Sequence, residues 1–168
     1  MSKIAYLALG SNLANPVAQL VKARAVIGEI AGVSLLRASS LYQSPAWGSS
    51  DPQPDYVNAV ISVATTLSTH DLWLAITLIE EAHGRVRNMA RNAARTLDID
   101  LLLYGDSAIR TADLTIPHPR MHERDFVLLP LLEIAPEVVI CGHGNAIDCL
   151  RKIVPTSIRK LGHNSSWS

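Results

Sequence analysis

The chain has few of the features that mark membrane or nucleic-acid-binding proteins. Its longest uninterrupted apolar run, residues 126–132, is far too short to cross a bilayer and contains Pro130, so we expect no membrane helix. Basic and acidic residues number 15 each, so no overall field draws the chain to nucleic acid or anionic lipid. Aromatic residues make up only 5% of the sequence and no RNP-like run is found, which argues against a module that binds RNA on the aromatic residues of an antiparallel sheet.

Cysteine and export signals are scarce as well. Cys141 and Cys149 are the only two cysteines and form no C-x-x-C pair, so we interpret both as reduced structural thiols. The apolar stretch at residues 4–9 is shorter than the core of a signal peptide and is followed by Gly10-Ser11-Asn12 rather than a cleavage-like site. We therefore expect a cytoplasmic protein.

Glycine-rich phosphate-binding motifs are missing too. The sequence contains neither G-x-x-x-x-G-K-[ST] nor G-x-G-x-x-G. Any phosphate binding must then depend on arginine side chains and metal ions.

The stretch 95–104 contains the most informative pattern that is present. Asp98 and Asp100 alternate with Leu97, Ile99 and Leu101, which on a strand places both carboxylates on one face. Two neighbouring carboxylates repel each other unless cations neutralise them, and a pair of Mg²⁺ ions would do so while leaving positions for phosphates. The alternative is an amphipathic edge strand with a solvated acidic face.

Arginines precede this strand in unusual number. Between Ala82 and Leu97 there is no acidic residue, but four arginines occur: Arg85, Arg87, Arg91 and Arg95. Guanidinium groups bind phosphate oxygens in pairs of hydrogen bonds, so the segment suggests a polyphosphate held between arginines and metal. A basic, solvated loop is the other interpretation.

The order of expected elements predicts an α+β fold in a single domain spanning 1–168. We expect a strand at 4–9, a helix at 15–30, strands at 33–42 and 56–66, a helix at 68–83 and a strand containing Asp98 and Asp100. This is the ferredoxin-like βαββαβ order, an antiparallel sheet with helices packed on it. Additional C-terminal helices are expected at 124–134 and 146–153, a long loop at 43–55 and a frayed tail at 160–168.

Five segments together resemble one family, 6-hydroxymethyl-7,8-dihydropterin pyrophosphokinase of folate biosynthesis. The segments are residues 6–13, 53–59, 84–87, 95–100 and 117–126, in family order. The resemblance implies transfer of the diphosphate of ATP to the hydroxymethyl group of the pterin, with release of AMP and with two Mg²⁺ ions. It implies small-molecule partners only, and we expect a monomer.

The resemblance also implies a role for individual residues. It implies metal binding by Asp98 and Asp100 and catalytic roles for these and for Arg85 and Arg95. It implies that ATP contacts Glu80, Arg85, Arg95, Thr115, His118 and Arg124. It implies that the pterin contacts Ser44, Pro45, Trp47, Tyr56, Asn58 and Phe126.

Two departures from the family pattern leave a further alternative open. Residues 92–94 are Asn-Ala-Ala where family members often have an aromatic residue, a glycine and a proline, and Pro119 stands where a tyrosine is common. These departures leave a nucleotide sensor that binds ATP without turnover as an alternative to the enzyme.

An alternative is also open for two of the residues implied to contact the pterin. Without the resemblance, Tyr56 and Phe126 would be interpreted as ordinary aromatic residues of the core.

Overall fold

The computed structural model describes residues 1–13, 15–46, 53–84 and 97–167, and an antiparallel sheet forms its centre. Within these residues the main strands are β1 (Lys3–Ser11), β2 (Val33–Ala38), β3 (Tyr42–Ser44), β4 (Tyr56–Thr65), β5 (Asp98–Tyr104) and β10 (Arg159–Lys160). They pair in the order β10-β3-β4-β1-β5, and β2 also pairs with β4. The two longest strands, β1 and β4, therefore lie at the centre, and β5 forms one edge.

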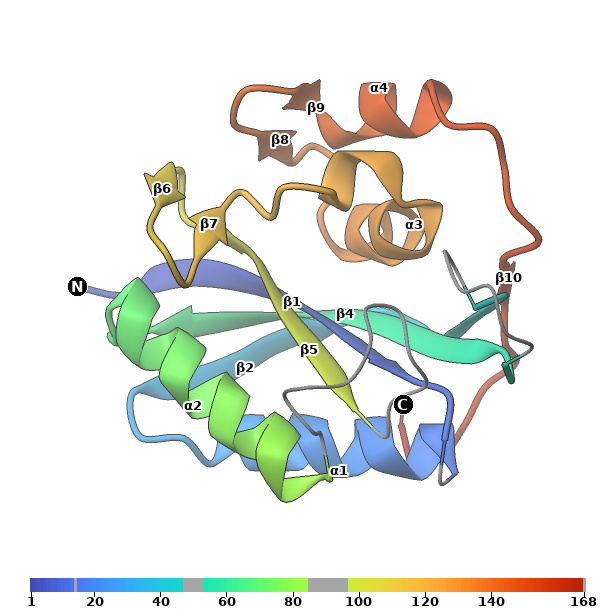
Figure 1. Ribbon diagram of the computed structural model, residues 1–168, viewed down its shortest axis with the longest axis horizontal. Helices are drawn as coiled ribbons and strands as arrows, with labels where there is room; N and C mark the ends of the chain where they lie inside the picture. Colours follow the sequence, from blue (N-terminus) through green and yellow to red (C-terminus); the bar gives the residue numbers. More distant parts are fainter. Residues whose placement is uncertain (14, 47–52, 85–96, 168) are drawn as a thin grey trace.

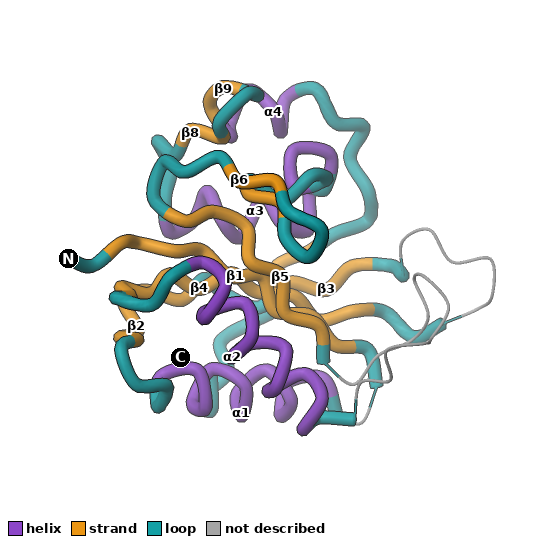
Figure 2. Tube along the Cα trace, turned by 60° about the vertical axis from the view of Figure 1, so that its left-hand side comes forward, coloured by secondary structure: helices purple, strands orange, loops and turns teal. Residues whose placement is uncertain are grey.

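Helices cover both faces of the sheet. α1 (Pro16–Gly28) and α2 (Thr69–Ala82) lie on one face, and α3 (Asp125–Ile134) and α4 (Ala146–Arg151) lie on the other, as Figures 1 and 2 both show. The smaller elements are β6 (Ile109–Arg110), β7 (Thr115–Ile116), η1 (Met121–Glu123), β8 (Val139–Ile140) and β9 (Gly144–Asn145). No helix among the described residues is long and apolar enough to cross a membrane.

Local sequence signals explain where the first two helices begin. The Asn15 side chain accepts a hydrogen bond from the Ala18 N–H, and Pro16 occupies the first helical position, where its missing N–H costs nothing. The Ser68 hydroxyl accepts from the Asp71 N–H in the same way. Both helices confirm the sequence prediction, although α1 ends two residues earlier than expected.

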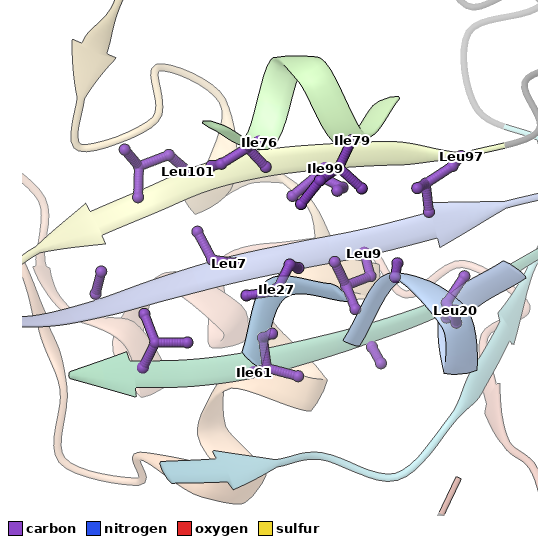
Figure 3. Packing of buried hydrophobic residues seen from close by; sticks show 14 of the residues in the cluster. Leu7, Leu9, Leu20, Ile27, Ile61, Ile76, Ile79, Leu97, Ile99 and Leu101 are labelled. Carbon is purple, nitrogen blue, oxygen red and sulfur yellow. The ribbon is translucent and has the colours of Figure 1, made fainter. Parts of the chain in front are cut away.

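Alternation along the strands sends side chains into two separate cores. On β1, Leu7 and Leu9 are buried against α1 and α2, whereas Tyr6 and Ala8 pack on the side of α3. Figure 3 shows the first core, where leucines and isoleucines of β1, β4 and β5 meet those of the two helices. The polar residues of the strands that face α3 therefore lie on a surface distinct from this core.

The structure corrects the expected strand at 33–42. It is interrupted at residues 39–41 and forms β2 and β3, which both pair with β4. β3 continues to Ser44, so the first residues of the loop expected at 43–55 belong to a strand. The Ser39 N–H donates to the Val60 carbonyl, and the Val60 N–H donates to the Ser39 hydroxyl. These side-chain and backbone hydrogen bonds pair polar groups of the chain where the strand bends.

The expected frayed tail is also wrong. Trp167 is only 3% exposed and packs in the core beneath α1, and its indole N–H donates to the Ser39 carbonyl at 2.8 Å. The guanidinium carbon of Arg24 lies 4.3 Å from the centre of the Trp167 ring. A buried indole of this kind anchors the end of the chain. Cys141 and Cys149 are free thiols, as expected.

Candidate functional site

The alternation predicted for Asp98 and Asp100 is present in β5. Ile99 and Leu101 are buried in the core with α1 and α2, so the two half-buried aspartates face the other side, toward α3. Asp98 pairs with Gly10 of β1, and Asp100 pairs with Ala8. Small residues therefore stand beside both carboxylates on the neighbouring strand.

Gly10 leaves open space in the middle of this surface. It pairs with Asp98 on one side and with Asn58 of β4 on the other, so the three residues form one row across the sheet. A Cβ atom at Gly10 would lie 3.4 Å from the Asn58 Oδ1 and 3.7 Å from a ring carbon of Tyr56. Gly10 thus leaves a patch of bare backbone between the carboxylate of Asp98 and the amide of Asn58, and we call this patch the floor of the site.

Asn58 is held in one orientation. It is 5% exposed, and its Nδ2 donates to the Ser44 Oγ of the adjacent strand β3 at 2.7 Å, inside the protein. Because Nδ2 is turned toward Ser44, the Oδ1 is the atom nearest the space above Gly10. Tyr56 lies at the start of β4, opposite Ser44, and the neighbouring Pro45 is exposed.

His118 lies beside the aspartates as a neutral imidazole. Its Nε2 is 3.9 Å from the Asp100 Oδ2, and its Nδ1 accepts a hydrogen bond from the Arg120 N–H at 3.2 Å. Burial lowers the pKa of His118 to about 4, the positive charge of Arg124 adds to this effect, and Asp98 opposes it. The accepting Nδ1 places the ring proton on Nε2, so His118 presents a hydrogen-bond donor on the side of Asp100.

Arg124 and Phe126 flank the same face from the first turn of α3. The guanidinium carbon of Arg124 is 5.6 Å from the centre of the Phe126 ring, a cation–π contact. Phe126 is partly buried against the core on the α3 side of the sheet. Both residues predicted on this segment therefore lie together at one end of α3.

A pocket of about 300 Å³ opens at the edge strand β5, beside Asp100 and His118. Of the residues predicted to contact metal or ATP, Asp100, Thr115 and His118 line this pocket, whereas Glu80 does not. Glu80 is 5% exposed, and its Oε2 accepts from the Ile99 N–H at 2.8 Å, which fixes α2 to β5. The pocket thus joins the aspartate face to the loop of residues 111–119.

Trp73 lines the same pocket and was missed in the sequence. It projects from α2, and its ring lies 5.9 Å from that of His70, one turn earlier. A lone tryptophan on a helix with an apolar stripe suggests a core residue, so nothing in its sequence context points to a pocket. Pro119, a departure from the family pattern, also contributes to the wall.

Three predicted site residues, Trp47, Arg85 and Arg95, lie outside the described residues, as do residues 92–94. Within the described parts of the chain, no three His, Cys, Asp or Glu side chains form a group that could hold a metal ion.

Comparison with known proteins shows which family the chain resembles in sequence. A model of the 7,8-dihydro-6-hydroxymethylpterin-pyrophosphokinase (HPPK) family matches residues 6–136, from β1 through the end of α3. The chain belongs to this family. The HPPK match includes both aspartates, Gly10, Asn58 and α2, and it ends before α4.

Individual HPPK relatives cover most of the chain. The 2-amino-4-hydroxy-6-hydroxymethyldihydropteridine pyrophosphokinase of Haemophilus influenzae is 48% identical over 136 residues, which are 81% of this chain and 84% of the relative. The protein of the same name from Methylorubrum extorquens is 38% identical over 157 residues, 94% of this chain and 98% of the relative.

A solved structure supports the fold. A crystal structure of Plasmodium falciparum HPPK-DHPS superposes with a TM-score of 0.70 at 14% identity. The match covers 90% of this chain but only 45% of that longer chain. At this identity the likeness concerns the fold alone: a mixed α/β structure with an antiparallel sheet.

Proposed function

We propose that this chain transfers the diphosphate of ATP to the hydroxymethyl group of 6-hydroxymethyl-7,8-dihydropterin, giving AMP and the pterin diphosphate for folate biosynthesis. The observation that supports this reaction most strongly is the family match over residues 6–136. The row of Asp98, Gly10 and Asn58 across the sheet supports its location. In this row Asp98 lies on one side of Gly10 and the fixed amide of Asn58 lies on the other. The acidic side would hold the metal ions and the phosphates of ATP, and the amide side would hold the pterin.

Asp98 and Asp100 would hold two Mg²⁺ ions together with ATP. Their carboxylate oxygens suit a hard cation, and the neighbouring His118 is a neutral donor rather than a competing cation. Because Mg²⁺ usually keeps several waters and binds through one or two carboxylates plus substrate phosphates, water and phosphate oxygens would complete each shell. Bound Mg²⁺ would neutralise the phosphate charge that repels the attacking oxygen.

His118 and Arg124 would hold the phosphates. The Nε2–H of His118 donates without adding charge, whereas the guanidinium of Arg124 supplies both a positive charge and paired donors. Arg85 and Arg95 are proposed to act with them as charge spreads over the transferred group.

The pocket beside β5 would take the nucleoside. Trp73 offers an aromatic face for the adenine ring, and Thr115 lies in the same wall. Contact of Thr115 and Glu80 with the ribose remains a prediction, and for Glu80 it would add to the bond already made to Ile99.

The pterin would lie over Gly10. The Oδ1 of Asn58 faces this space and would accept from an N–H group on the edge of the ring, while Tyr56 and Phe126 would stack on its faces. Ser44, Pro45 and Trp47 are proposed to border the ring.

We also propose the ferredoxin-like type for the βαββαβ part of the fold. The order β3-β4-β1-β5, with α1 and α2 on one face, supports it. A monomeric state, a cytoplasmic location and the absence of a nucleic-acid partner remain predictions from the sequence.

Product analysis tests the proposed reaction. Purified protein is incubated with ATP, Mg²⁺ and the hydroxymethyldihydropterin, and the products are separated by chromatography. We expect AMP and pterin diphosphate in equal amounts, and no AMP when the pterin is omitted. Binding of ATP without AMP formation would favour the nucleotide sensor instead, and formation of ADP would contradict diphosphate transfer.

A further inference from the structure

The last residues of the chain cross from one face of the sheet to the other. We call residues 152–167 the C-terminal strap. It leaves α4 on one face, passes the edge strand β3 by forming β10, and ends on the opposite face beneath α1, as Figure 1 shows. The strap lies outside the residues matched by the family model, which end at 136.

One contact of the strap reaches the first turn of α3. The backbone N–H and the hydroxyl of Thr156 both donate to the Asp125 Oδ2, at 2.9 and 2.7 Å. Asp125 is 3% exposed and stands between Arg124 and Phe126. Two hydrogen bonds to one buried carboxylate oxygen are strong and directional, so they fix how this turn is rotated about the helix axis. That rotation sets where the side chains of Arg124 and Phe126 point.

A second contact runs along β3. Arg159 and Lys160 pair with Gln43 and Tyr42, and the Leu161 N–H donates to the Leu41 carbonyl. β3 would otherwise be an edge, so the strap supplies its outer partner.

Side chains extend this second contact toward the pterin side of the site. The Arg159 Nη2 donates to the Gln43 Oε1 at 2.8 Å, and the Gln43 Nε2 donates to the Asp55 Oδ2 at 2.9 Å. Asp55 directly precedes Tyr56, and Gln43 directly precedes Ser44. The chain of hydrogen bonds therefore ends next to Ser44 and Tyr56, two of the residues proposed to contact the pterin.

The strap is fixed at its far end by Trp167. The buried indole is hydrogen-bonded to Ser39, between β2 and β3, and Ser39 is bonded in turn to Val60 of β4. The strap is thus attached to the rigid sheet and bonded to two segments that border the floor.

We propose that the C-terminal strap positions the two aromatic sides of the pterin site, Thr156 through Asp125 on the Phe126 side and Arg159 through Gln43 and Asp55 on the Tyr56 side. This rests on the proposed binding of the pterin over Gly10. Thr156 and Arg159 are positioning residues, because each acts on the site through another side chain. Both are exposed, so shortening either side chain removes hydrogen bonds without opening a cavity in the core.

The test is Thr156→Ala, compared with Thr156→Ser and with Ser157→Ala. The alanine variant loses the hydroxyl donor to Asp125, the serine variant keeps it, and Ser157 is an adjacent exposed control outside these contacts. We expect Thr156→Ala to raise the KM for the pterin by about fivefold, because the variant loses one hydrogen bond to a carboxylate and only part of that free energy affects pterin binding. The KM for ATP should change less than about twofold. Thr156→Ser should restore the wild-type value, and Ser157→Ala should match it.

An unchanged KM for the pterin in Thr156→Ala, an equal rise for both substrates, or failure of serine to rescue would overturn the proposal. Arg159→Ala is a second test, because it should also raise the KM for the pterin, and the free-energy effects of the two alanine variants should be additive.

Titration monitored by the fluorescence of the pterin measures its Kd for each variant without requiring turnover. If wild-type protein binds the pterin but forms no AMP, the proposed reaction fails while the strap is still judged on Kd. If wild-type protein does not bind the pterin, both proposals are contradicted.

Discussion

The Nδ2 of Asn58 donates to the Oγ of Ser44 at 2.7 Å across β3 and β4. Both side chains are nearly inaccessible to solvent, at 5% and 3% exposure. The bond decides which end of the amide faces Gly10, and so whether the proposed site would offer the pterin an acceptor or a donor. In the proposed site, recognition of the ring edge would therefore depend on Ser44 as well as on Asn58.

Ser44→Ala should weaken pterin binding without affecting the nucleotide. The amide loses the partner that orients it, and one buried N–H group loses its acceptor, which costs about 1–3 kcal/mol of stability. We expect the KM for the pterin to rise about tenfold and the KM for ATP to stay near the wild-type value. Steady-state kinetics, with chemical denaturation alongside, would check both effects; an equal rise in both KM values would contradict this role.

Gly10→Ala should impair turnover more than it impairs folding. The added Cβ would lie 3.4 Å from the Asn58 Oδ1, close enough to narrow the floor but far enough to avoid a severe clash with the backbone. We expect the KM for the pterin to increase at least about tenfold, since a flat ring loses its close approach to the sheet. Gly162→Ala is the matched control, because nothing lies within 4 Å of a Cβ there. Wild-type kinetics in Gly10→Ala would show that the pterin does not lie over this residue.

Trp73→Ala should weaken ATP binding alone. Loss of one aromatic stacking partner is worth about 0.5–1.5 kcal/mol, or roughly two- to tenfold in affinity. Leu78→Ala removes an exposed apolar side chain of the same helix, 65% accessible, and should leave affinity unchanged. Titration calorimetry with a non-hydrolysable ATP analogue measures both variants. Equal affinities for wild type and Trp73→Ala would place the base elsewhere.

Glu133 should make the stability of the β2–β3 bend pH-dependent. Its carboxylate accepts from the Ser40 N–H and hydroxyl and from the Tyr42 hydroxyl. Burial raises the pKa of Glu133, but these hydrogen bonds and the charge of Lys160 outweigh burial and lower it below its ordinary value. A lowered pKa in the folded state means that the stabilisation is present above the unfolded pKa and is lost as pH falls through the folded pKa.

Glu133→Gln should therefore cost stability near neutral pH and little in acid. Because the side chain is largely exposed, we expect a loss of roughly 0.5–1 kcal/mol at pH 7. Urea unfolding of both proteins at pH 7 and at a pH below the folded pKa measures the difference. A difference that stays constant across this range would contradict the titration of Glu133.

The strands β1, β4 and β5 and the helices α1 and α2 could be predicted because their signals are local. Alternation of Asp98 and Asp100 with apolar residues identified β5 and the face of its carboxylates, and the capping residues Asn15 and Ser68 identified the starts of α1 and α2. These features need only a few neighbouring residues, so a single sequence contains them.

The remaining features depend on contacts between distant residues. The bond between Ser44 and Asn58 needs the register of β3 on β4, and the role of the tail needs Trp167 to meet Ser39, 128 positions earlier. Trp73 was missed because its helical context is the same for a core residue and for a pocket wall. Local patterns contain no information about which of these partners a side chain meets.

The most direct test of the central claim is product formation by Asp98→Asn across a range of Mg²⁺ concentrations. The substitution keeps the size of the side chain but removes one of the two charges proposed to hold the metal, and Asp106→Asn removes a charge from the exposed turn after β5. We expect Asp98→Asn to lose about 100-fold or more of pterin-dependent AMP formation at every Mg²⁺ concentration. Its metal-free thermal stability should be equal to or above that of wild type, because a repulsive carboxylate pair is relieved. Asp106→Asn should behave as wild type. Full turnover by Asp98→Asn at saturating Mg²⁺ would contradict the account.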